Sequence, residues 1–332
     1  MQILVTGSDG FLGSHITDLL LKKNYKVKAL FHPGSSAVSE LPEKDGFSVV
    51  NGSLMDKENL KKALSGVNAV IHTAASTMVF PPKNKIIWDI NYHGTINLAE
   101  AAQKSGIEKF IHIGTANSFV PGTIDNPGNE EKINPPGTSP LDYIESKKAA
   151  QIFLMDLHKK TGFPVVVINP TYMLGPGDRK PGSGIMLLRI YGKKIIPVTS
   201  GGKNYIYVKD VAAAAVSALE KGKDGQAYIC GNKNMTYSEA LPLFAEIINE
   251  KKVKKISMPA AFILFFGLTN NVYSKLTGKT PWVSYTMTRL SLKDYYYSAE
   301  KAVKELDLPQ TPLENAVKEA INWFKENGYV NE

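Results

Sequence analysis

A tyrosine and a lysine stand four residues apart in the stretch LDYIESKKAAQ, which runs from Leu141 to Gln151. Residues at this spacing lie on one face of a helix, so Tyr143 and Lys147 are expected to point the same way. A tyrosine near its reference pKa of about 10 is a poor acid or base at neutral pH. A neighbouring ammonium favours the phenolate and lowers that pKa, which suits general acid–base chemistry. The adjacent Lys148 falls elsewhere on the helix and is expected to be solvated.

Spacing alone leaves two interpretations of this pair, a catalytic dyad or two amphipathic side chains on a solvated face. The stretch FIHIGTANSF favours the dyad, because it is typical of a strand that ends in small hydroxyl residues. The carboxyl edge of a parallel sheet is where ligands bind in open α/β folds. A catalytic role for the dyad therefore requires a sheet that places a hydroxyl residue and a cofactor at the same edge.

A glycine-rich turn, TGSDGFLG, separates the first predicted strand from the first predicted helix, which begins near Phe11. Glycines let the backbone approach a pyrophosphate closely, and a helix N-terminus presents unpaired amides and a partial positive charge. The spacing is GxxGxxG and not GxGxxG. Its place between a first strand and a first helix predicts a dinucleotide site. The residues assigned to this site are Gly7, Gly10, Phe11, Leu12 and Gly13.

The end of the second predicted strand, KVKALF, bears on the choice between NAD and NADP. A carboxylate there binds the ribose 2′-hydroxyl of NAD and repels a 2′-phosphate. No acidic residue occurs between Asp18 and Glu40, and the strand ends on Phe31 and His32, followed by Ser35 and Ser36. We therefore expect NADP(H) to be favoured, with His32 near the 2′-phosphate. The alternative is that His32 is merely exposed and either cofactor is accepted.

Short apolar runs alternate with helical patterns through the first half of the chain. Runs this short, rich in Val and Ile and bounded by turns, are typical of strands buried on both faces of a parallel sheet. The pattern predicts the doubly wound α/β class. The runs are Ile3 to Thr6, Val27 to Phe31, Phe47 to Asn51, Ala69 to Thr73, Phe110 to Gly114 and Val165 to Asn169.

The second half of the chain differs in character and predicts a smaller, helix-rich substrate lobe. We assign residues 1–171 and 205–232 to the dinucleotide-binding domain and residues 172–204 and 233–332 to the lobe. A proline- and glycine-rich loop between Pro121 and Pro140 precedes the Tyr/Lys helix. The most apolar run, Met258 to Leu268, is about half of the ~20 residues that a spanning helix needs. It is expected to be a buried helix of the lobe; a substrate tunnel wall or a membrane-surface contact is the alternative.

The composition of the chain argues against several classes of function. The formal net charge of +8 comes from scattered lysines, which suits an anionic cofactor or substrate better than nucleic acid. The one cysteine, Cys230, excludes an internal disulfide, and the six histidines show no metal-ligand spacing, so no metal is expected. The N-terminus lacks the pattern of a signal peptide, and we expect a cytoplasmic protein.

With these motifs in place, the sequence resembles an extended short-chain dehydrogenase/reductase of the NAD-dependent epimerase/dehydratase superfamily. TGxxGxxG, a strand ending in Ser/Thr, and YxxxK occur in the family's order, and VIHTAA, NYHGTINLAEAA and INPTYMLGPGD continue the match. LTGKTPWVS and DYYYSAEKAVKEL make the chain similar to the dihydroflavonol-reductase-like and 3β-hydroxysteroid-dehydrogenase-like branch. The resemblance covers nearly the whole chain, more strongly as far as about Ala214.

The resemblance implies catalytic roles residue by residue. Tyr143 would be the general acid for a carbonyl oxygen, or the base in the reverse direction. Lys147 would lower the pKa of Tyr143 and bind the nicotinamide ribose. Thr115 would hydrogen-bond the same substrate oxygen, with Ser118 as the alternative. Asn91 matches the family's helix asparagine, whose role is structural or catalytic.

The resemblance also implies further cofactor contacts. Thr73, Ala74 and Ala75 would line the adenine and ribose side of the cofactor, and Pro170 would lie by the nicotinamide. Ser53 and Leu54, after the third predicted strand, would lie near the adenine.

Three departures from the family's pattern stand out. Ser53 replaces a common aspartate, Lys209 replaces an acid or histidine, and Asn169 replaces an arginine that often anchors a nucleotide-sugar phosphate.

The favoured function is NADPH-dependent reduction of a ketone or aldehyde of a mostly apolar small molecule. The lobe offers AFILFFG and the aromatic cluster Tyr295 to Tyr297, and the whole chain has just three arginines, Arg179, Arg189 and Arg289. The alternatives are a nucleotide-sugar epimerase or dehydratase, and a non-catalytic NADP(H)-binding sensor. By analogy with the family, we expect a homodimer through the helices at Asn91 to Ser105 and Leu141 to Lys160.

Overall fold

The structure is a computed structural model that describes residues 1–33 and 45–330. The strands are β1 (Gln2–Thr6), β2 (Lys26–Phe31), β3 (Phe47–Asn51), β4 (Ala69–His72), β5 (Lys109–Ile113), β6 (Val165–Pro170), β7 (Tyr172–Leu174), β8 (Ile195–Val198), β9 (Gly202–Tyr207), β10 (Gln226–Cys230), β11 (Lys233–Thr236), β12 (Lys254–Ser257) and β13 (Asp294–Tyr295). The α-helices are α1 (Phe11–Lys22), α2 (Lys57–Leu64), α3 (Lys85–Trp88), α4 (Gly94–Lys104), α5 (Asp142–Thr161), α6 (Ile185–Ile190), α7 (Val208–Ser217), α8 (Tyr237–Asn249), α9 (Ala260–Thr277), α10 (Tyr285–Leu290), α11 (Glu300–Leu306) and α12 (Leu313–Glu326).

A seven-stranded parallel sheet forms the centre of the molecule, in the order β10-β6-β5-β4-β1-β2-β3. All six predicted strands are present in it, and the doubly wound α/β class is confirmed. The strand order reverses between β1 and β4, because the chain first extends the sheet toward β3 and then returns to the other side of β1. Ligands of open α/β sheets bind at the carboxyl edge beside such a reversal.

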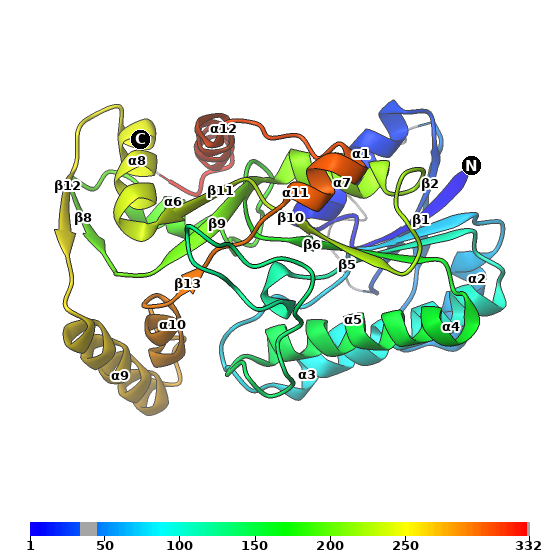
Figure 1. Cartoon of the computed structure of the whole chain (residues 1–332), viewed down its shortest axis with the longest axis horizontal. Helices are drawn as coiled ribbons and strands as arrows, with labels where there is room; N and C mark the ends of the chain where they lie inside the picture. Colours follow the sequence, from blue (N-terminus) through cyan, green and yellow to red (C-terminus); the bar gives the residue numbers. More distant parts are fainter. Residues whose placement is uncertain (34–44, 331–332) are drawn as a thin grey trace.

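Helices cover both faces of this sheet: α1, α7 and α11 lie on one face, and α2, α4 and α5 on the other (Figure 1). Successive side chains of a strand point to opposite faces, and the two cores follow that alternation. In β1, Ile3 and Val5 belong to the core under α1 and α7, whereas Leu4 belongs to the core under α2 and α4. Burial on both faces explains why these strands have continuous apolar sequences.

A smaller lobe lies beside the carboxyl edge of the sheet, on the left in Figure 1. Its main sheet has the order β11-β9-β13 with β7 also paired to β9, and β8 pairs with β12. The expected boundary between residues 204 and 205 falls inside β9, which leads directly into α7 of the larger domain. One continuous strand and helix thus connect the two parts. The division into two domains stays a prediction.

The burial expected for the run Met258 to Leu268 is wrong. From Ala260 the run forms the first half of α9, in which Phe265 is 65% exposed and Leu276, near the end of the helix, is 82% exposed. No helix in the described part of the chain is both long enough and apolar enough to cross a membrane. The exposed side chains of α9 therefore need a different explanation.

The proline-rich loop between Pro121 and Pro140 is held in place by both parts of the molecule. The amides of Gly122 and Gly128 both donate to the carbonyl of Tyr296, which follows β13. On the other side, the Asn134 side-chain amide donates to the carbonyl of Phe119 at 2.7 Å. These bonds fix the loop just ahead of the helix that carries Tyr143.

Candidate active site

The glycine turn after β1 is tightly closed. The Gly10 amide donates to the Gly7 carbonyl at 3.0 Å, and α1 begins at Phe11, as predicted. Gly7 has φ +70°, a left-handed conformation that favours glycine. A Cβ on Gly13 would lie 2.0 Å from the Gly7 carbonyl oxygen. Glycine at position 13 therefore allows the first turn of α1 to sit directly against the loop.

The residues around this turn fit a dinucleotide cofactor such as NAD(P). The first turn of α1 has no side-chain cap, so its amides face the space beyond Gly10. A Cβ on Gly7 would approach the Ala74 backbone to 2.8 Å, which shows how little room side chains leave there. The hydroxyl of Ser8 is buried and has no hydrogen-bond partner within the described residues. Unpaired donors at a helix N-terminus are suited to a pyrophosphate.

The segment after β4 braces the turn. The Thr73 hydroxyl donates to the carbonyl of Thr6 at 2.6 Å and lies 3.1 Å from that of Gly7, while the Ala74 amide donates to the Thr6 hydroxyl at 3.2 Å. Thr73, Ala74 and Ala75 therefore lie beside the glycine turn, on the side of the sheet where a cofactor contact was predicted. The contact itself stays a prediction.

The residues expected near the adenine end lie after neighbouring strands, β2 and β3. His32 is exposed just beyond Phe31, which pairs in register with Asn51. Ser53 accepts a hydrogen bond from the Met55 amide, and Leu54 packs on Gly94 of α4. Ser35 and Ser36, named above with His32, lie outside the described residues.

Thr115 and Tyr143 are brought together at the carboxyl edge of the sheet. Thr115 follows β5 and is 5% exposed, and its hydroxyl is close enough to the phenol of Tyr143 on α5 to lower the pKa of that phenol. The alternative hydroxyl, Ser118, is fully buried three residues further on, and its oxygen has no partner in the described structure. The geometry thus pairs the predicted acid with Thr115.

The pKa of Tyr143 is determined mainly by burial and not by the charge of Lys147. Burial raises the pKa of Tyr143, and the nearby Thr115 hydroxyl lowers it by a smaller amount. Burial also lowers the pKa of the Lys147 amine to about 7, because this side chain is 2% exposed. A lysine that is partly neutral at pH 7 stabilises a phenolate less than a fully charged one. The expectation of a lowered tyrosine pKa is therefore wrong for this structure.

Lys147 lies in a buried basic cluster that the sequence did not predict. Its amine is 3.3 Å from Nε2 of His112, whose ring centroid is 5.3 Å from that of His72. His72 bridges the hydroxyls of Thr6 and Thr95 at 2.7 and 2.9 Å. Burial, with the charge of Lys147 as a second cause, lowers the pKa of His72 to about 3 and that of His112 well below its usual range.

Asn91 ties two segments of the site together. Its side-chain oxygen accepts from the Ser76 amide at 2.7 Å, and its nitrogen donates to the Ser76 carbonyl and to the Ser146 hydroxyl. Ser146 lies on α5 between Tyr143 and Lys147. Asn91 was expected to have a structural or a catalytic role, and these hydrogen bonds support the structural one.

Asn169 is a site residue whose role the sequence reasoning missed. It is fully buried at the end of β6, and its side-chain oxygen accepts a 2.9 Å hydrogen bond from the Thr115 amide. It thereby positions the hydroxyl residue that contacts Tyr143. Pro170 follows it, buried at the same strand end. One sequence feature could have indicated this contact. The strands β5 and β6 are consecutive in a parallel sheet, so residues at their C-terminal ends are expected to lie side by side.

The expectation that Lys148 is solvated is wrong. It is 1% exposed and forms a 2.9 Å ion pair with Glu145 on the same helix. Its amine also donates to the Pro135 carbonyl at 2.8 Å, while Glu145 accepts from the amides of Gly137 and Ser139. The loop before α5 folds back over this pair and removes it from water.

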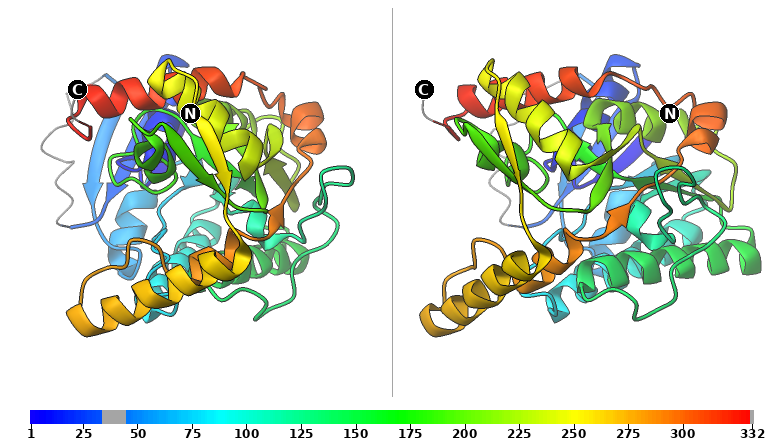
Figure 2. Two further views of the ribbon diagram at one scale, coloured as in Figure 1. Left: turned by 90° about the vertical axis from the view of Figure 1, so that its left-hand side faces the viewer. Right: turned by 60° about the vertical axis from the view of Figure 1, so that its left-hand side comes forward.

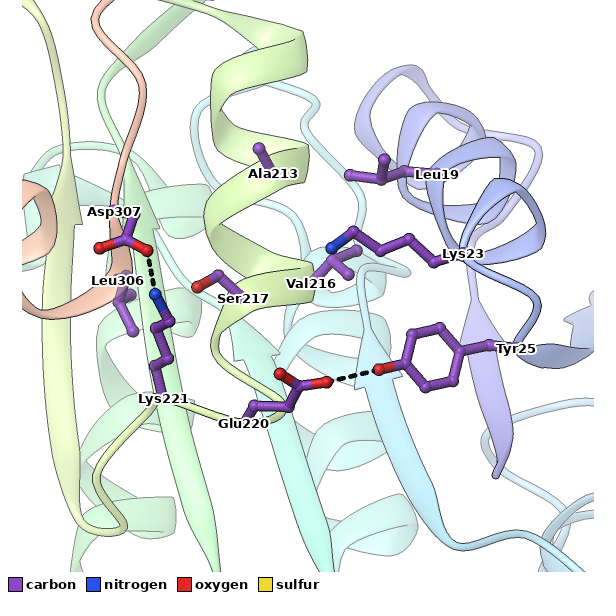
Figure 3. A pocket seen from close by; sticks show the side chains of 10 residues that line it. All are labelled: Leu19, Lys23, Tyr25, Ala213, Val216, Ser217, Glu220, Lys221, Leu306 and Asp307. Carbon is purple, nitrogen blue, oxygen red and sulfur yellow. Dashed lines mark hydrogen bonds and ion pairs between the residues drawn. The ribbon is translucent and has the colours of Figure 1, made fainter.

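A hollow of about 280 Å³ lies far from this site, between the C-terminal ends of α1 and α7 and the end of α11 (Figure 3). A hydrogen bond from Tyr25 to Glu220 and the Lys221–Asp307 ion pair cross it. Since α1 begins at the carboxyl edge of the sheet, its C-terminal end is near the amino edge. The hollow is therefore separate from the candidate active site.

Comparison with known proteins agrees with this geometry. The NAD dependent epimerase/dehydratase family matches residues 3–231 of the chain. The "Putative dihydroflavonol 4-reductase" of Synechocystis sp. is 29% identical over 338 residues, covering 98% of this chain and 95% of that protein. "Sterol demethylase protein B" of Methylococcus capsulatus is 26% identical over 337 residues, covering 99% and 100%.

Solved structures show the same architecture. The crystal structure of gox2253 superposes with a TM-score of 0.81 at 28% identity, covering 99% of both chains. A UDP-glucose 4-epimerase from Thermotoga maritima has a TM-score of 0.77 at 23% identity, over 98% of this chain and 99% of that one, and supports the fold alone. With the family match spanning more than two thirds of the sequence, the chain belongs to the NAD dependent epimerase/dehydratase family.

Proposed function

We propose that this protein is an NADPH-dependent oxidoreductase that reduces a ketone or aldehyde on a mostly apolar small molecule. The observation that carries the proposal is the position of Tyr143 beside Thr115, whose hydroxyl is close enough to lower the pKa of the phenol, on the carboxyl edge that also bears the glycine turn. A non-catalytic NADP(H) sensor has no need of a hydroxyl, a phenol and a lysine arranged in this way.

The cofactor would supply a hydride to the carbonyl carbon, and the protein must supply a proton to the oxygen. Tyr143 would donate its phenolic proton, and Thr115 would hold the same oxygen through its hydroxyl. Burial raises the pKa of Tyr143, so the phenol stays protonated at neutral pH, as an acid must. In this mechanism the ammonium form of Lys147 would stabilise the phenolate that remains and bind the nicotinamide ribose.

The cofactor contacts proposed are those of the glycine turn, of Thr73 to Ala75, of Ser53 and Leu54, and of Pro170. NADPH is favoured because no acidic residue follows β2 before Glu40, and His32 stands directly after that strand. The two-domain division, a homodimer through α4 and α5, and a cytoplasmic location remain predictions.

A nucleotide-sugar epimerase or dehydratase is the second candidate, and the observation in its favour is Lys203 of β9. This half-buried amine lies 4.3 Å from the Tyr172 ring centroid, and burial lowers its pKa to about 8. No acidic side chain pairs with it in the described ranges 1–33 and 45–330, so it could pair with an anionic substrate. Arg189, by contrast, stacks on Trp282 and donates to its carbonyl.

The test combines cofactor binding with turnover. NADPH and NADH are titrated by fluorescence quenching, and a panel of apolar carbonyl compounds is assayed beside nucleotide sugars. Tyr143→Phe is expected to lower kcat by about 10²- to 10⁴-fold while NADPH binding is retained. Tyr25→Phe, which removes a remote hydroxyl bonded to Glu220, is the matched control. Full turnover by Tyr143→Phe would contradict the mechanism.

The two candidate substrates are separated by Lys203→Met. Loss of activity on a nucleotide sugar, with apolar carbonyls turned over no faster than background, would support the second candidate and overturn the first. Unchanged reduction of an apolar carbonyl by Lys203→Met would support the reductase. Equal affinity for NADH and NADPH would contradict the argument from His32.

A further inference from the structure

The outer face of α9 is apolar and exposed in the described structure. Residues 262, 265, 269, 272 and 276 follow one another at steps of three and four and therefore share one face of the helix. All but Thr269 are apolar and all are exposed; Phe262 is 54%, Phe265 65% and Leu276 82% exposed. From Phe262 to Leu276 this face is about 21 Å long at 1.5 Å per residue.

The inner face of α9 is already occupied by α10. Ile263, Gly267 and Ser274 are its buried residues, and a Cβ on Gly267 would lie 2.4 Å from the Thr288 hydroxyl. The small residues let the two helices approach closely. The exposed phenylalanines and leucines of α9 lie on the opposite side, which no other element covers within residues 1–33 and 45–330. Both views of Figure 2 show α9 at the periphery, with its C-terminal end extending beyond the rest of the ribbon.

Aromatic side chains extend this apolar surface. Trp282, in the segment between α9 and α10, is 61% exposed and packs edge-on against Phe266 at 5.9 Å between ring centroids. The Arg189 guanidinium lies 5.0 Å from the Trp282 ring. Tyr273 is 54% exposed on α9 itself. Trp, Tyr and Arg beside exposed Phe and Leu are the composition of a helix that lies in a membrane interface.

The charge of the chain segment around α9 favours an anionic partner. Residues 251–293 contain eight basic residues and no acidic residue. All eight are exposed: Lys251, Lys252, Lys254, Lys255, Lys275, Lys279, Arg289 and Lys293. A second copy of this face would bring like charges together in a two-fold interface, which is unfavourable. An anionic lipid surface has the complementary charge and accepts the apolar side chains.

We propose that α9, with Trp282, is an interfacial helix that docks the protein on an anionic membrane surface, parallel to the plane of the lipid. The apolar face supplies the insertion, and the basic segment supplies attraction to the headgroups, so binding weakens with salt. The proposal goes beyond the catalytic function above and does not depend on it.

The experiment is vesicle flotation of the full chain with phosphatidylcholine alone and with phosphatidylcholine containing phosphatidylglycerol. We expect binding to the anionic vesicles, little to the zwitterionic ones, and release by added salt. The triple variant Phe262→Ser, Phe265→Ser, Leu276→Ser is expected to reduce the partition coefficient by at least about tenfold. The control is Met55→Ser with Ile86→Ser, which are 53% and 59% exposed and lie just before α2 and on α3.

A second readout needs no change to α9. In a background with Trp88→Phe and Trp323→Phe, the remaining Trp282 should show a blue-shifted, more intense emission when anionic vesicles are added. Absence of both flotation and this shift would overturn the proposal, as would equal binding by the triple variant. A dimer in light scattering that the triple variant dissociates would also overturn it, since α9 would then be a protein interface. NADPH titration of each variant separates these outcomes from failure of the catalytic proposal.

Discussion

The amine of Lys147 lies 3.3 Å from Nε2 of His112, so two basic groups share one buried position beside the proposed proton donor. Burial lowers the pKa of both, to about 7 for the lysine. The charge of Lys147 is therefore set by its surroundings and changes near neutral pH. This relationship leads to the first prediction, which concerns stability and needs no substrate.

Lys147→Met is expected to be more stable than the wild type at about pH 7, by an amount that decreases as the pH rises. The pKa of Lys147 is lowered from 10.5 in the unfolded chain to about 7 in the folded protein. Between these values the unfolded chain binds the extra proton, so wild-type stability increases with pH. Urea unfolding at about pH 7 and about pH 9.5 should show the difference shrinking on the order of 2 kcal/mol. A pH-independent difference would contradict the burial of a titrating amine.

Gly13→Ala is expected to weaken NADPH binding by at least about tenfold and to destabilise the fold by about 1–3 kcal/mol. The new Cβ would lie 2.0 Å from the Gly7 carbonyl oxygen, which forces the turn and α1 apart. Gly182→Ala is the control, since a Cβ there would meet no atom of the described residues within 4 Å. Fluorescence titration and thermal unfolding measure the two effects. Normal cofactor affinity in Gly13→Ala would rule out this turn as the pyrophosphate site.

Asn169→Ala is expected to lower kcat with little change in NADPH affinity. The substitution removes the acceptor for the Thr115 amide and leaves that buried donor unpaired, at a cost of about 1–3 kcal/mol in stability. Asn249→Ala removes an asparagine acceptor bonded to the exposed Gly192 amide in the smaller lobe, and should leave kcat unchanged. If both variants lost activity equally, the effect would be one of general stability and not of Thr115 placement.

The Glu145–Lys148 pair is expected to show a larger coupling energy than an exposed pair of the same spacing. A double-mutant cycle with Glu145→Gln and Lys148→Met should give about 1–3 kcal/mol, because each single change leaves a buried charge unpaired. Asp156 and Lys159 on the same helix, 51% and 76% exposed, provide the control cycle, expected below about 0.5 kcal/mol. Amide exchange at Gly137 and Ser139 should accelerate in the first cycle alone. Equal couplings would contradict a structural role for the buried pair.

Local patterns were sufficient for the fold and for much of the candidate site. Short apolar runs predicted six strands of the central sheet, and a turn with glycines at 7, 10 and 13 predicted the start of α1. Helical spacing placed Tyr143 and Lys147 on one helix. These features depend on residues close together in the chain, where the steric rules of strands, turns and helices apply directly.

Contacts between distant segments required the tertiary structure. Asn169 reaches Thr115 across neighbouring strands, and Lys148 is buried because a loop folds back over its helix. The run Met258 to Leu268 has the composition of a core helix, yet only Ile263 and Gly267 of it are buried, and its phenylalanines are exposed. The composition of a segment shows how apolar it is. It does not show which face of the helix packs against another element.

The sequence by itself determined the parallel α/β fold, the glycine turn and the shared helix of Tyr143 and Lys147, because each follows from periodicity or backbone freedom over a few residues. The tertiary structure alone decided how water is excluded from these groups. It raised the pKa of Tyr143, lowered that of Lys147, and left α9 exposed. Burial depends on the packing of the whole chain, and desolvation determines which form of an ionisable group is stable.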